Sequence, residues 1–382
     1  MIAPHGDKLI ERVLDDNQRG DIIERAPGLL HIRLDAGSIS DVENIATGVF
    51  SPLAGFMGRE DFHHVLNQLR LSNDLPWTIP IVLDVDKSEA ARLKAGSQVI
   101  LTNDESDPVA VLHLEEKYDY DREEMARKVF GTTDAVHPGA AKVLNMKDVL
   151  LSGKIDLIQK PPTPFARFKL TPRETRELFK EKGWRTVVGF QTCGIPHLGH
   201  EHVQKSALAF ADGVFISPVV GGKKRGDYRD EVILASYEEL IKTYDLKERA
   251  VMAILQMEMR HAGPREAIFH AVIRKNFGCT HIIIGRDQAG VGNYYHPFAA
   301  QDIFEEFPDL RIVPLFFRSF YYCKKCLSVV NETICPHPPP DQIHYSGTEI
   351  RDMLLRGESP PPELVRPEVA KIIRDTKNPF ND

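Results

Sequence analysis

Residues 185–202 read RTVVGFQTCGIPHLGHEH, in which a short apolar run passes directly into a polar stretch with two histidines spaced three residues apart. The apolar run at 185–190 predicts a buried strand. The residues from about 199 onward predict a helix. A strand that leads straight into a helix is the first half of a βαβ unit, in which helices connect parallel strands.

The same alternation continues on both sides of this segment. Residues 171–183, TPRETRELFKEKG, predict a helix, and the apolar runs AVMAIL at 250–255 and HIIIGRD at 281–287 predict further buried strands. Apolar strands separated by segments of helix length indicate a parallel sheet with right-handed crossovers. We therefore expect an α/β domain that binds its ligands at the carboxyl ends of the strands.

The N-terminal part has a different pattern. Short apolar runs broken by turn signals, at 78–85, 97–104 and 108–114, predict mixed β structure. The proline-rich segment KPPTPFARF at 160–168 predicts a linker, because proline removes backbone donors and disfavours helix before it. We expect domains at 1–165, 166–320 and 321–382, and we find no internal repeat.

Length and composition exclude several classes of protein. A chain of 382 residues with 42% hydrophobic and 27% charged residues predicts two or three globular domains. The net charge of −7 argues against binding to nucleic acid or to an anionic membrane surface, so any bound anion must be captured locally. The N-terminus has no apolar segment of signal-peptide length and no run approaches 18 apolar residues, so we expect a cytoplasmic protein.

The histidines His197 and His200 are the first candidate functional residues. The predicted helix would place them at its N-terminus, where free N–H groups and the positive end of the dipole favour an anion. Two imidazoles can add hydrogen bonds to a phosphate, and Gly199 lets the chain approach a ligand closely. The alternatives are ordinary surface histidines, or a zinc pair for which no acidic or cysteine partner is nearby.

A second candidate segment lies far downstream, at Tyr345-Ser-Gly-Thr-Glu-Ile-Arg351. The hydroxyls of Ser346 and Thr348 and the guanidinium of Arg351, on the first turn of a helix, can hold phosphate oxygens through charge-assisted hydrogen bonds. The alternative is a plain capping box followed by a solvated arginine.

The cysteines form a third pattern. Three of the five lie between 323 and 335, and Cys323, Cys326, Cys335 and His337 supply three thiolates and one imidazole. This is the ligand set of a closed tetrahedral structural zinc site, with unligated thiols or a disulfide as the alternatives. Cys279 precedes a buried strand and is expected in the core, whereas Cys193 lies beside a helix N-terminus, which lowers the pKa of a thiol.

Taken together, the histidine motif at 197–200 and the segment at 345–351 resemble the paired motifs of the nucleotidyltransferase superfamily, whose members move AMP or CMP onto an anionic acceptor. The stretches at 4–6 (PHG), 48–57 (GVFSPLAGFM), 259–266 (MRHAGPRE) and 285–292 (GRDQAGVG) further resemble the sulfate adenylyltransferase family, also called ATP sulfurylase. The resemblance runs from about residue 4 to about residue 370. It implies a PUA-like β-rich N-terminal domain, a Rossmann-like catalytic domain, and a small C-terminal domain that holds zinc.

The resemblance also implies a reaction and its residues. ATP with Mg²⁺ would react with sulfate to give adenylyl sulfate and pyrophosphate, and the implied assembly is a homodimer. The implied catalytic residues are Thr192, His197 and His200. The implied nucleotide-binding residues are Gln191, Gly194, Gly285, Arg286, Asp287, Gln288, Ser346, Thr348 and Arg351. The implied sulfate contacts are Gln191 and the backbone N–H of Ala289.

Three substitutions depart from the family pattern. Cys193 and Gly194 stand where the family loop has an arginine and an asparagine, and Gln288 replaces a histidine. If sulfate is the acceptor, another cation must replace the missing arginine in binding it, and the candidates are Lys223, Arg225 and Arg265. Lys224 either matches a family lysine near the active cleft or belongs to a solvated basic turn. Two other functions stay open: an adenylyltransferase for a different oxyanion, and a nucleotide-binding relative with weak catalysis.

Overall fold

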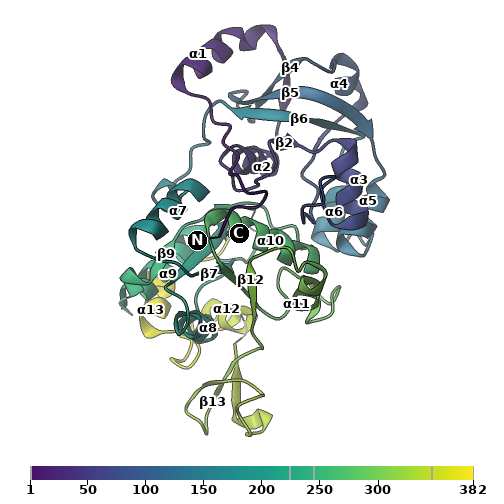
Figure 1. The fold of residues 1–382 in the computed structure, drawn as a ribbon. Coiled ribbons are helices and arrows are strands. Elements are labelled where there is room, and N and C mark those ends of the chain that lie inside the picture. The colour runs from purple at the N-terminus through teal and green to yellow at the C-terminus, as the bar shows by residue number, and fades with distance from the viewer. Residues whose placement is uncertain (1, 223–224, 244–245, 346, 382) are drawn as a thin grey trace.

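The computed structural model describes residues 2–222, 225–243, 246–345 and 347–381. It has an N-terminal lobe and a second lobe built on a parallel sheet, from which a small three-stranded arm projects (Figure 1). Short 3-10 turns lie at Ala26–Gly28, Ala166–Phe168, Leu246–Glu248, Ile303–Glu306 and Pro339–Asp341. No helix in these described ranges is both long and apolar enough to cross a bilayer.

The N-terminal lobe is built on a mixed sheet, as its sequence pattern predicts. The strand order is β1 (Leu30–Arg33), β4 (Gln98–Thr102), β5 (Pro108–Asp119), β6 (Val149–Leu157) and β2 (Gly55–Phe56), with β3 (Leu83–Val85) also paired to β6. The predicted strand at 78–85 is thus confirmed only at its end, since Pro80 lacks the N–H that a paired strand requires. The helices are α1 (Asp16–Arg25), α2 (Ala36–Ala46), α3 (Arg59–Gln68), α4 (Lys87–Arg92), α5 (Arg122–Phe130) and α6 (Pro138–Leu144).

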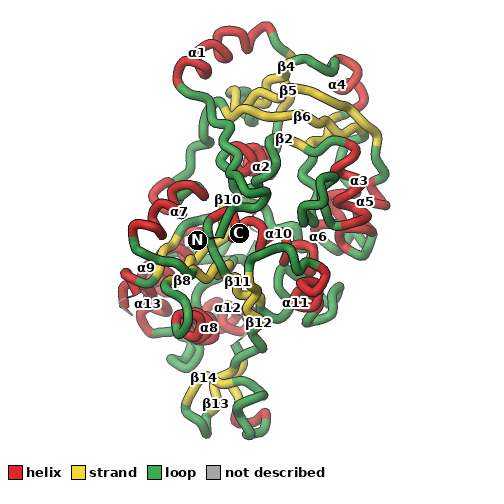
Figure 2. The backbone as a smooth tube through the Cα atoms, viewed as in Figure 1, coloured by secondary structure: helices red, strands yellow, loops and turns green. Residues whose placement is uncertain are grey.

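The second lobe confirms the predicted parallel sheet. Its strand order is β10 (Leu255–Gln256), β8 (Gly213–Val220), β7 (Val187–Thr192), β11 (His281–Ile284) and β12 (Val313–Phe316), with β9 (Ala250–Met252) also on β8. Every pairing in this sheet is parallel. Helix α7 (Pro172–Glu181) precedes the first strand of this sheet. The helices between its strands are α8 (Leu198–Leu208), α9 (Asp230–Thr243), α10 (Pro264–Phe277) and α11 (Ala299–Asp302), which Figure 2 shows in red around the yellow strands.

Helix α10 joins the two lobes. Its residues from 266 to 277 are all buried, as expected of a helix with protein on every side. The Phe269 ring packs against Phe50 and Trp77 of the N-terminal lobe at centroid distances of 5.1 and 5.5 Å. The side chain of Asn276 donates to the carbonyl oxygens of Val49 and Ser51, both at 2.9 Å. The interface between the lobes is therefore a packed core in which the amide of Asn276 is hydrogen-bonded.

The C-terminal part contributes to two different cores. Strands β13 (Tyr321–Cys323), β14 (Ser328–Val330) and β15 (Gln342–His344) form the antiparallel arm, which has a small hydrophobic cluster of its own. Helices α12 (Gly347–Leu355) and α13 (Pro367–Asp375) instead share a core with the parallel sheet, in which Ile350 and Ile373 pack with Val188. The chain after the arm thus returns to the sheet and places residues near α8.

Candidate functional site

The candidate site lies where the neighbouring strands β7 and β11 end. Gln191 and Thr192 are the last residues of β7, and Cys193 and Gly194 follow in the loop that leads into α8. The loop after β11 carries Gly285 to Ala289. A third loop, before α10, lies against the loop after β11. The backbone N–H of Gly263 in this third loop donates to the carbonyl oxygen of Ala289 at 3.1 Å. The fold therefore brings together loops that lie about 70 to 100 positions apart, at the edge where parallel sheets bind ligands.

His197 and His200 lie face to face at the start of α8. Their ring centroids are 3.7 Å apart and the ring planes differ by 21°. His197 is the N-cap of α8, and its Nδ1 atom accepts the backbone N–H of His200 at 3.2 Å. Because Nδ1 accepts this bond, the neutral ring carries its proton on Nε2, where it can be donated.

Burial keeps both imidazoles neutral. It lowers the pKa of His197 well below its ordinary value, with the neighbouring His200 as a second cause. Burial also lowers the pKa of His200 to about 4. The Nδ1 atom of His200 is buried and has no hydrogen-bond partner within the described residues. The pair can therefore serve as neutral hydrogen-bond donors near pH 7.

The helix terminus itself offers less than the sequence predicts. The backbone N–H of Leu198 donates to the carbonyl oxygen of Leu364 at 2.9 Å, and that of His200 is used by the His197 ring. Two of the first N–H groups of α8 are thus already satisfied. The space beside Gly199 is also taken by protein, because a Cβ there would lie 2.7 Å from the Tyr345 ring. The donors that remain for an anion are mainly the ring nitrogens.

Gln191 is held by a buried network. Its Oε1 accepts a hydrogen bond from Arg274 Nη2 at 2.7 Å, and its Nε2 lies 3.0 and 3.1 Å from the two ring nitrogens of His270. His270 Nε2 in turn lies 3.3 Å from a carboxylate oxygen of Glu266. Glu266, His270 and Arg274 all belong to α10 and are fully buried. Gln191 is therefore held in one orientation by side chains of α10.

The network also shapes the loop before α10. The carboxylate of Glu266 accepts the backbone N–H groups of Arg260 and Ala262 at 2.9 and 3.0 Å. Burial opposes ionisation of Glu266, but the His270 ring and these N–H groups outweigh it and lower its pKa. Sequence reasoning missed these three residues. Their spacing of four on one helix is the signal that could have found them, since they form a polar stripe among apolar neighbours.

The residues expected to bind nucleotide lie on the loop after β11. Arg286 forms an ion pair with Asp287 at 3.0 Å, and both side chains are exposed. Asp287 and Ala289 both have a φ of 55°, and the N–H of Gly290 donates to the Asp287 carbonyl at 3.1 Å, so the loop is a tight turn. Asp287 and Gln288 line a cavity of about 160 Å³.

A larger cavity of about 470 Å³ lies between the lobes. Cys193, Arg260 and Gly290 are on its wall, together with Lys142 from the N-terminal lobe. Five carboxylates also line it: Asp35, Asp41, Asp84, Asp227 and Glu258. Lys142 pairs with Glu258 and, at 3.8 Å, with Asp35. Arg260 Nη2 contacts both carboxylate oxygens of Asp41, at 2.6 and 2.7 Å.

Arg265, one of the cations expected to bind sulfate, lies elsewhere in the structure, and Arg260 is a further candidate for this role. Arg265 does not line this cavity, because its guanidinium donates to the carbonyl oxygens of Val65, Leu66 and Thr78 at 2.9 to 3.4 Å. Burial lowers the Arg265 pKa to about 10. Arg225 is exposed, and Lys223 and Lys224 lie outside the described residues. Arg260, which sequence reasoning did not select, is the arginine that lines the cavity with Cys193.

The structure describes only part of the segment at 345–351, which was expected to bind phosphate. Ser346 lies outside the described residues, and so does the side chain of Thr348. Arg351 Nη1 donates to the carbonyl oxygen of Gly226 at 3.3 Å, and Arg351 Nε lies 3.9 Å from Asp352. Arg351 therefore contacts the turn that follows β8.

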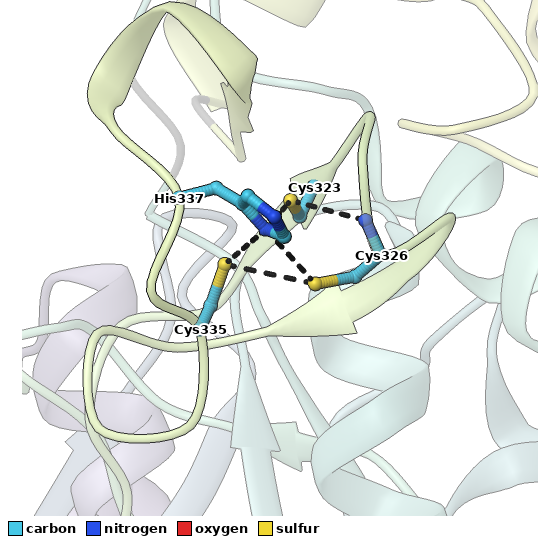
Figure 3. Close-up of side chains that lie close together, drawn as sticks. All are labelled: Cys323, Cys326, Cys335 and His337. Atoms are coloured by element: carbon cyan, nitrogen blue, oxygen red, sulfur yellow. Dashed lines mark hydrogen bonds between the residues drawn. The ribbon is translucent and has the colours of Figure 1, made fainter.

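The four predicted metal ligands converge in the arm (Figure 3). The Nδ1 atom of His337 lies 3.4, 3.3 and 3.6 Å from the sulfur atoms of Cys323, Cys326 and Cys335. The sulfurs of Cys326 and Cys335 are 3.8 Å apart, and no disulfide joins the described cysteines. Thiolates bound at about 2.3 Å in a tetrahedron lie roughly 3.8 Å from one another, so the donor set fits a zinc ion. Cys279 is fully buried, as predicted, and burial raises its pKa to about 12.

Comparison with known proteins agrees with this geometry. The ATP-sulfurylase family model matches residues 166–376, and a PUA-like domain model matches residues 2–160. Sulfate adenylyltransferases of Hyperthermus butylicus and Pyrococcus abyssi are each 55% identical to this chain over 99% of its length, and 97% and 98% of their own lengths are covered. The enzyme of Cenarchaeum symbiosum is 50% identical over 100% of this chain and 99% of its own.

A solved structure has a similar fold at low identity. It is described as a hexameric APS kinase from Thiobacillus denitrificans, and its TM-score is 0.77. The two chains are 22% identical, and the match covers 99% of this chain and 69% of the other. At this identity the likeness concerns the fold alone.

Proposed function

The chain belongs to the sulfate adenylyltransferase family, and from this premise we propose how its residues transfer the adenylyl group of ATP to sulfate. The protein is an enzyme of the transferase class, with adenylyl sulfate and pyrophosphate as its products. The observation that carries the proposed mechanism is the pair of stacked, neutral imidazoles at the end of β7.

In the proposed step, a sulfate oxygen attacks the α-phosphorus of ATP in line. The new bond joins sulfate to AMP, and the bond between the α-phosphorus and the bridging oxygen breaks, so that pyrophosphate leaves with that electron pair. His197 donates its Nε2 proton as a hydrogen bond to phosphate oxygens, and His200 acts beside it. Neutral donors in a buried site stabilise the developing charge without having to lose a proton.

The other predicted residues keep their proposed roles. Thr192 shapes the loop, because its Oγ1 donates to the carbonyl oxygen of Gly194 at 3.1 Å. The nucleotide would lie along Gly194, the loop of Gly285 to Gln288, and the start of α12 with Ser346, Thr348 and Arg351. The parallel sheet supports a Rossmann-like nucleotidyltransferase domain. Mg²⁺ would come with ATP and would neutralise part of the phosphate charge as pyrophosphate leaves.

Sulfate would lie between Gln191 and the backbone N–H of Ala289. Arg260 supplies the charge that Cys193 lacks, since both residues line one cavity and Asp41 holds the guanidinium from the other lobe. The N-terminal lobe therefore takes part in acceptor binding. The Cys323, Cys326, Cys335 and His337 cluster would hold zinc as a closed structural site, which supplies stability and no open coordination position. A homodimer stays a prediction from the family resemblance.

One observation favours a second candidate acceptor. Among the described residues, the cavity beside Cys193 is lined by five carboxylates against one lysine and one arginine, Lys142 and Arg260, which is a poor environment for a dianion. An acceptor with less charge than sulfate would be repelled less. This lining is the observation in favour of the second candidate, an adenylyltransferase for another oxyanion.

The deciding experiment measures pyrophosphate release from ATP and Mg²⁺ with sulfate, phosphate or no acceptor. We expect release with sulfate and formation of adenylyl sulfate. Release only with another oxyanion would replace sulfate as the acceptor. Nucleotide binding without release under any of these conditions would reject the enzyme mechanism and favour a weakly catalytic relative.

A further inference from the structure

We propose that Tyr345 is a positioning residue that holds the imidazole of His197 in its donating orientation, and that the metal-binding arm sets the place of Tyr345. The idea rests on the proposed role of His197 and extends it to a residue outside the parallel sheet. Tyr345 follows strand β15 directly and is the last described residue before position 346.

The geometry of the rings carries the proposal. The Tyr345 ring stacks on His197 with centroids 5.1 Å apart and an interplanar angle of only 1°. His200 stacks on His197 at 3.7 Å, and Phe190 contacts His200 edge-on at 5.3 Å. His197 therefore lies between two flat rings, which oppose tilting of the imidazole about its side-chain bonds. A fixed ring plane fixes the direction of the Nε2–H bond.

Gly199 provides independent support for this contact. A Cβ atom at position 199 would lie 2.7 Å from Cδ2 of Tyr345 and 3.0 Å from Nδ1 of His197. Real Cβ atoms do not approach other atoms that closely, so the first turn of α8 admits the Tyr345 ring only because residue 199 has no side chain. The glycine of the histidine motif thus makes room for a protein ring.

The arm determines where Tyr345 lies. Strand β15 pairs with β13, and Gln342 is opposite Cys323 in the register. The side chain of Gln342 also donates to the carbonyl oxygen of His337 at 2.9 Å. Two residues of the cysteine and histidine cluster therefore anchor the strand that ends beside His197. Because metal binding at such clusters is coupled to folding, the arm can hold Tyr345 firmly only when the cluster is ordered.

The environment of the Tyr345 hydroxyl suggests which substitutions can test the role of the ring. Its Oη atom is buried and lacks a hydrogen-bond partner in the part of the chain that the structure describes. Tyr345→Phe keeps the ring and removes only this unbonded group, whereas Tyr345→Leu removes the flat ring. Phe320→Leu is the matched control, because Phe320 precedes β13 and packs on His202, another histidine of α8, at 4.7 Å. Neither Phe320 nor His202 belongs to the proposed site.

Pyrophosphate release should separate the three variants. We expect Tyr345→Leu to lower kcat about 10- to 100-fold, the loss typical of a misplaced catalytic group, with the KM values for ATP and sulfate little changed. Tyr345→Phe and Phe320→Leu should keep kcat within about twofold of the wild type. An unchanged kcat in Tyr345→Leu would overturn the proposal. An equal loss in Phe320→Leu would overturn it too, because the effect would then belong to packing of the arm.

NMR of histidine-labelled protein gives a readout that does not need turnover. The His197 signals, assigned with His197→Gln, should show the neutral tautomer protonated on Nε2 in the wild type and in Tyr345→Phe. Tyr345→Leu should shift these signals and mix the tautomers, with its zinc content unchanged. If wild-type protein releases no pyrophosphate, the proposed function fails. The NMR result would still show whether Tyr345 holds the His197 ring in its orientation. Unshifted His197 signals in Tyr345→Leu would reject the positioning role.

Discussion

Arg274 donates a hydrogen bond from Nη2 to Oε1 of Gln191 over 2.7 Å, although the residues lie 83 positions apart in the chain. Arg274 is fully buried on α10, whereas Gln191 is partly buried near the end of β7. The bond turns the carbonyl oxygen of the Gln191 amide toward the protein. The amide nitrogen is thereby held on the side of His270, which sets the orientation of a proposed sulfate contact.

Arg274→Met should therefore weaken sulfate binding more than ATP binding. A hydrogen bond from a charged donor contributes about 1.5 to 3 kcal/mol, which corresponds to a roughly 10- to 100-fold rise in the KM for sulfate. Initial rates at varied sulfate and at varied ATP would measure this, and melting would report the accompanying loss of stability. Arg356→Met, an exposed arginine paired with Glu358, is the control. Equal rises in both KM values would contradict the assignment.

Arg260→Gln tests the replacement cation. Removing the guanidinium should raise the KM for sulfate about 10- to 100-fold while that for ATP changes little, because a charge-assisted bond to the acceptor is lost. Asp41→Asn should have a smaller effect in the same direction, since it loosens the Arg260 side chain. Arg225→Ala is the control, as that side chain is exposed. A rise in the sulfate KM for Arg225→Ala but not for Arg260→Gln would make Arg225 the cation.

His197→Ala and His200→Ala should each lower kcat by about two to three decades, the cost of removing a preorganised donor from a buried site. The sequence alone suggests that stability would not change. The structure predicts instead that both variants melt at lower temperature, because the rings are packed with Tyr345 and Phe190. Single-turnover assays and thermal melting measure the two effects separately. Near-normal turnover in either variant would remove that histidine from the mechanism.

The cluster in the arm should bind about one zinc ion per chain, as a site with three thiolates and one imidazole does. Cys326→Ser should lose the metal and lower the melting temperature, since metal binding supplies folding free energy to the arm. Cys193→Ser should keep its zinc, because that exposed cysteine is far from the cluster in the sequence and is not among its ligands. Elemental analysis of the three proteins is the measurement. A disulfide between Cys323 and Cys326 would contradict the site.

Stability should fall as the pH falls from 7 toward 4. Burial, followed by the charge of Lys275, lowers the pKa of His5 to about 4, and burial lowers that of His200 to about 4 as well. Between pH 6.5 and about 4 the unfolded chain binds protons that the folded chain does not, so acid favours unfolding. Each such histidine contributes roughly 2 kcal/mol to the loss between pH 7 and pH 5.

His5→Asn isolates one of these contributions. Denaturant titrations at pH 7 and pH 5 should show a smaller difference in unfolding free energy for this variant than for the wild type. His63→Asn, at an exposed position of α3, should keep the wild-type difference. An unchanged difference in His5→Asn would mean that His5 is not held neutral in the fold.

Features that depend on local patterns could be predicted from the amino-acid sequence. Apolar runs between helix-length segments predicted a parallel sheet, because the strands of such a sheet are buried on both faces. The spacing of Cys323, Cys326, Cys335 and His337 predicted their convergence, since close spacing leaves the chain few other ways to arrange them. The histidine motif at the end of β7 was likewise found from contiguous residues.

The charged and aromatic side chains that surround the histidine motif could not be predicted in this way, because they come from distant parts of the chain. Arg260 and Arg265 are five positions apart, yet one lines the cavity and the other is bound by carbonyl oxygens of the N-terminal lobe. Tyr345 reaches His197 across 148 positions of chain. Such contacts form because buried polar and aromatic groups must find partners, and the packing of the lobes, rather than local spacing, determines which partner lies within reach.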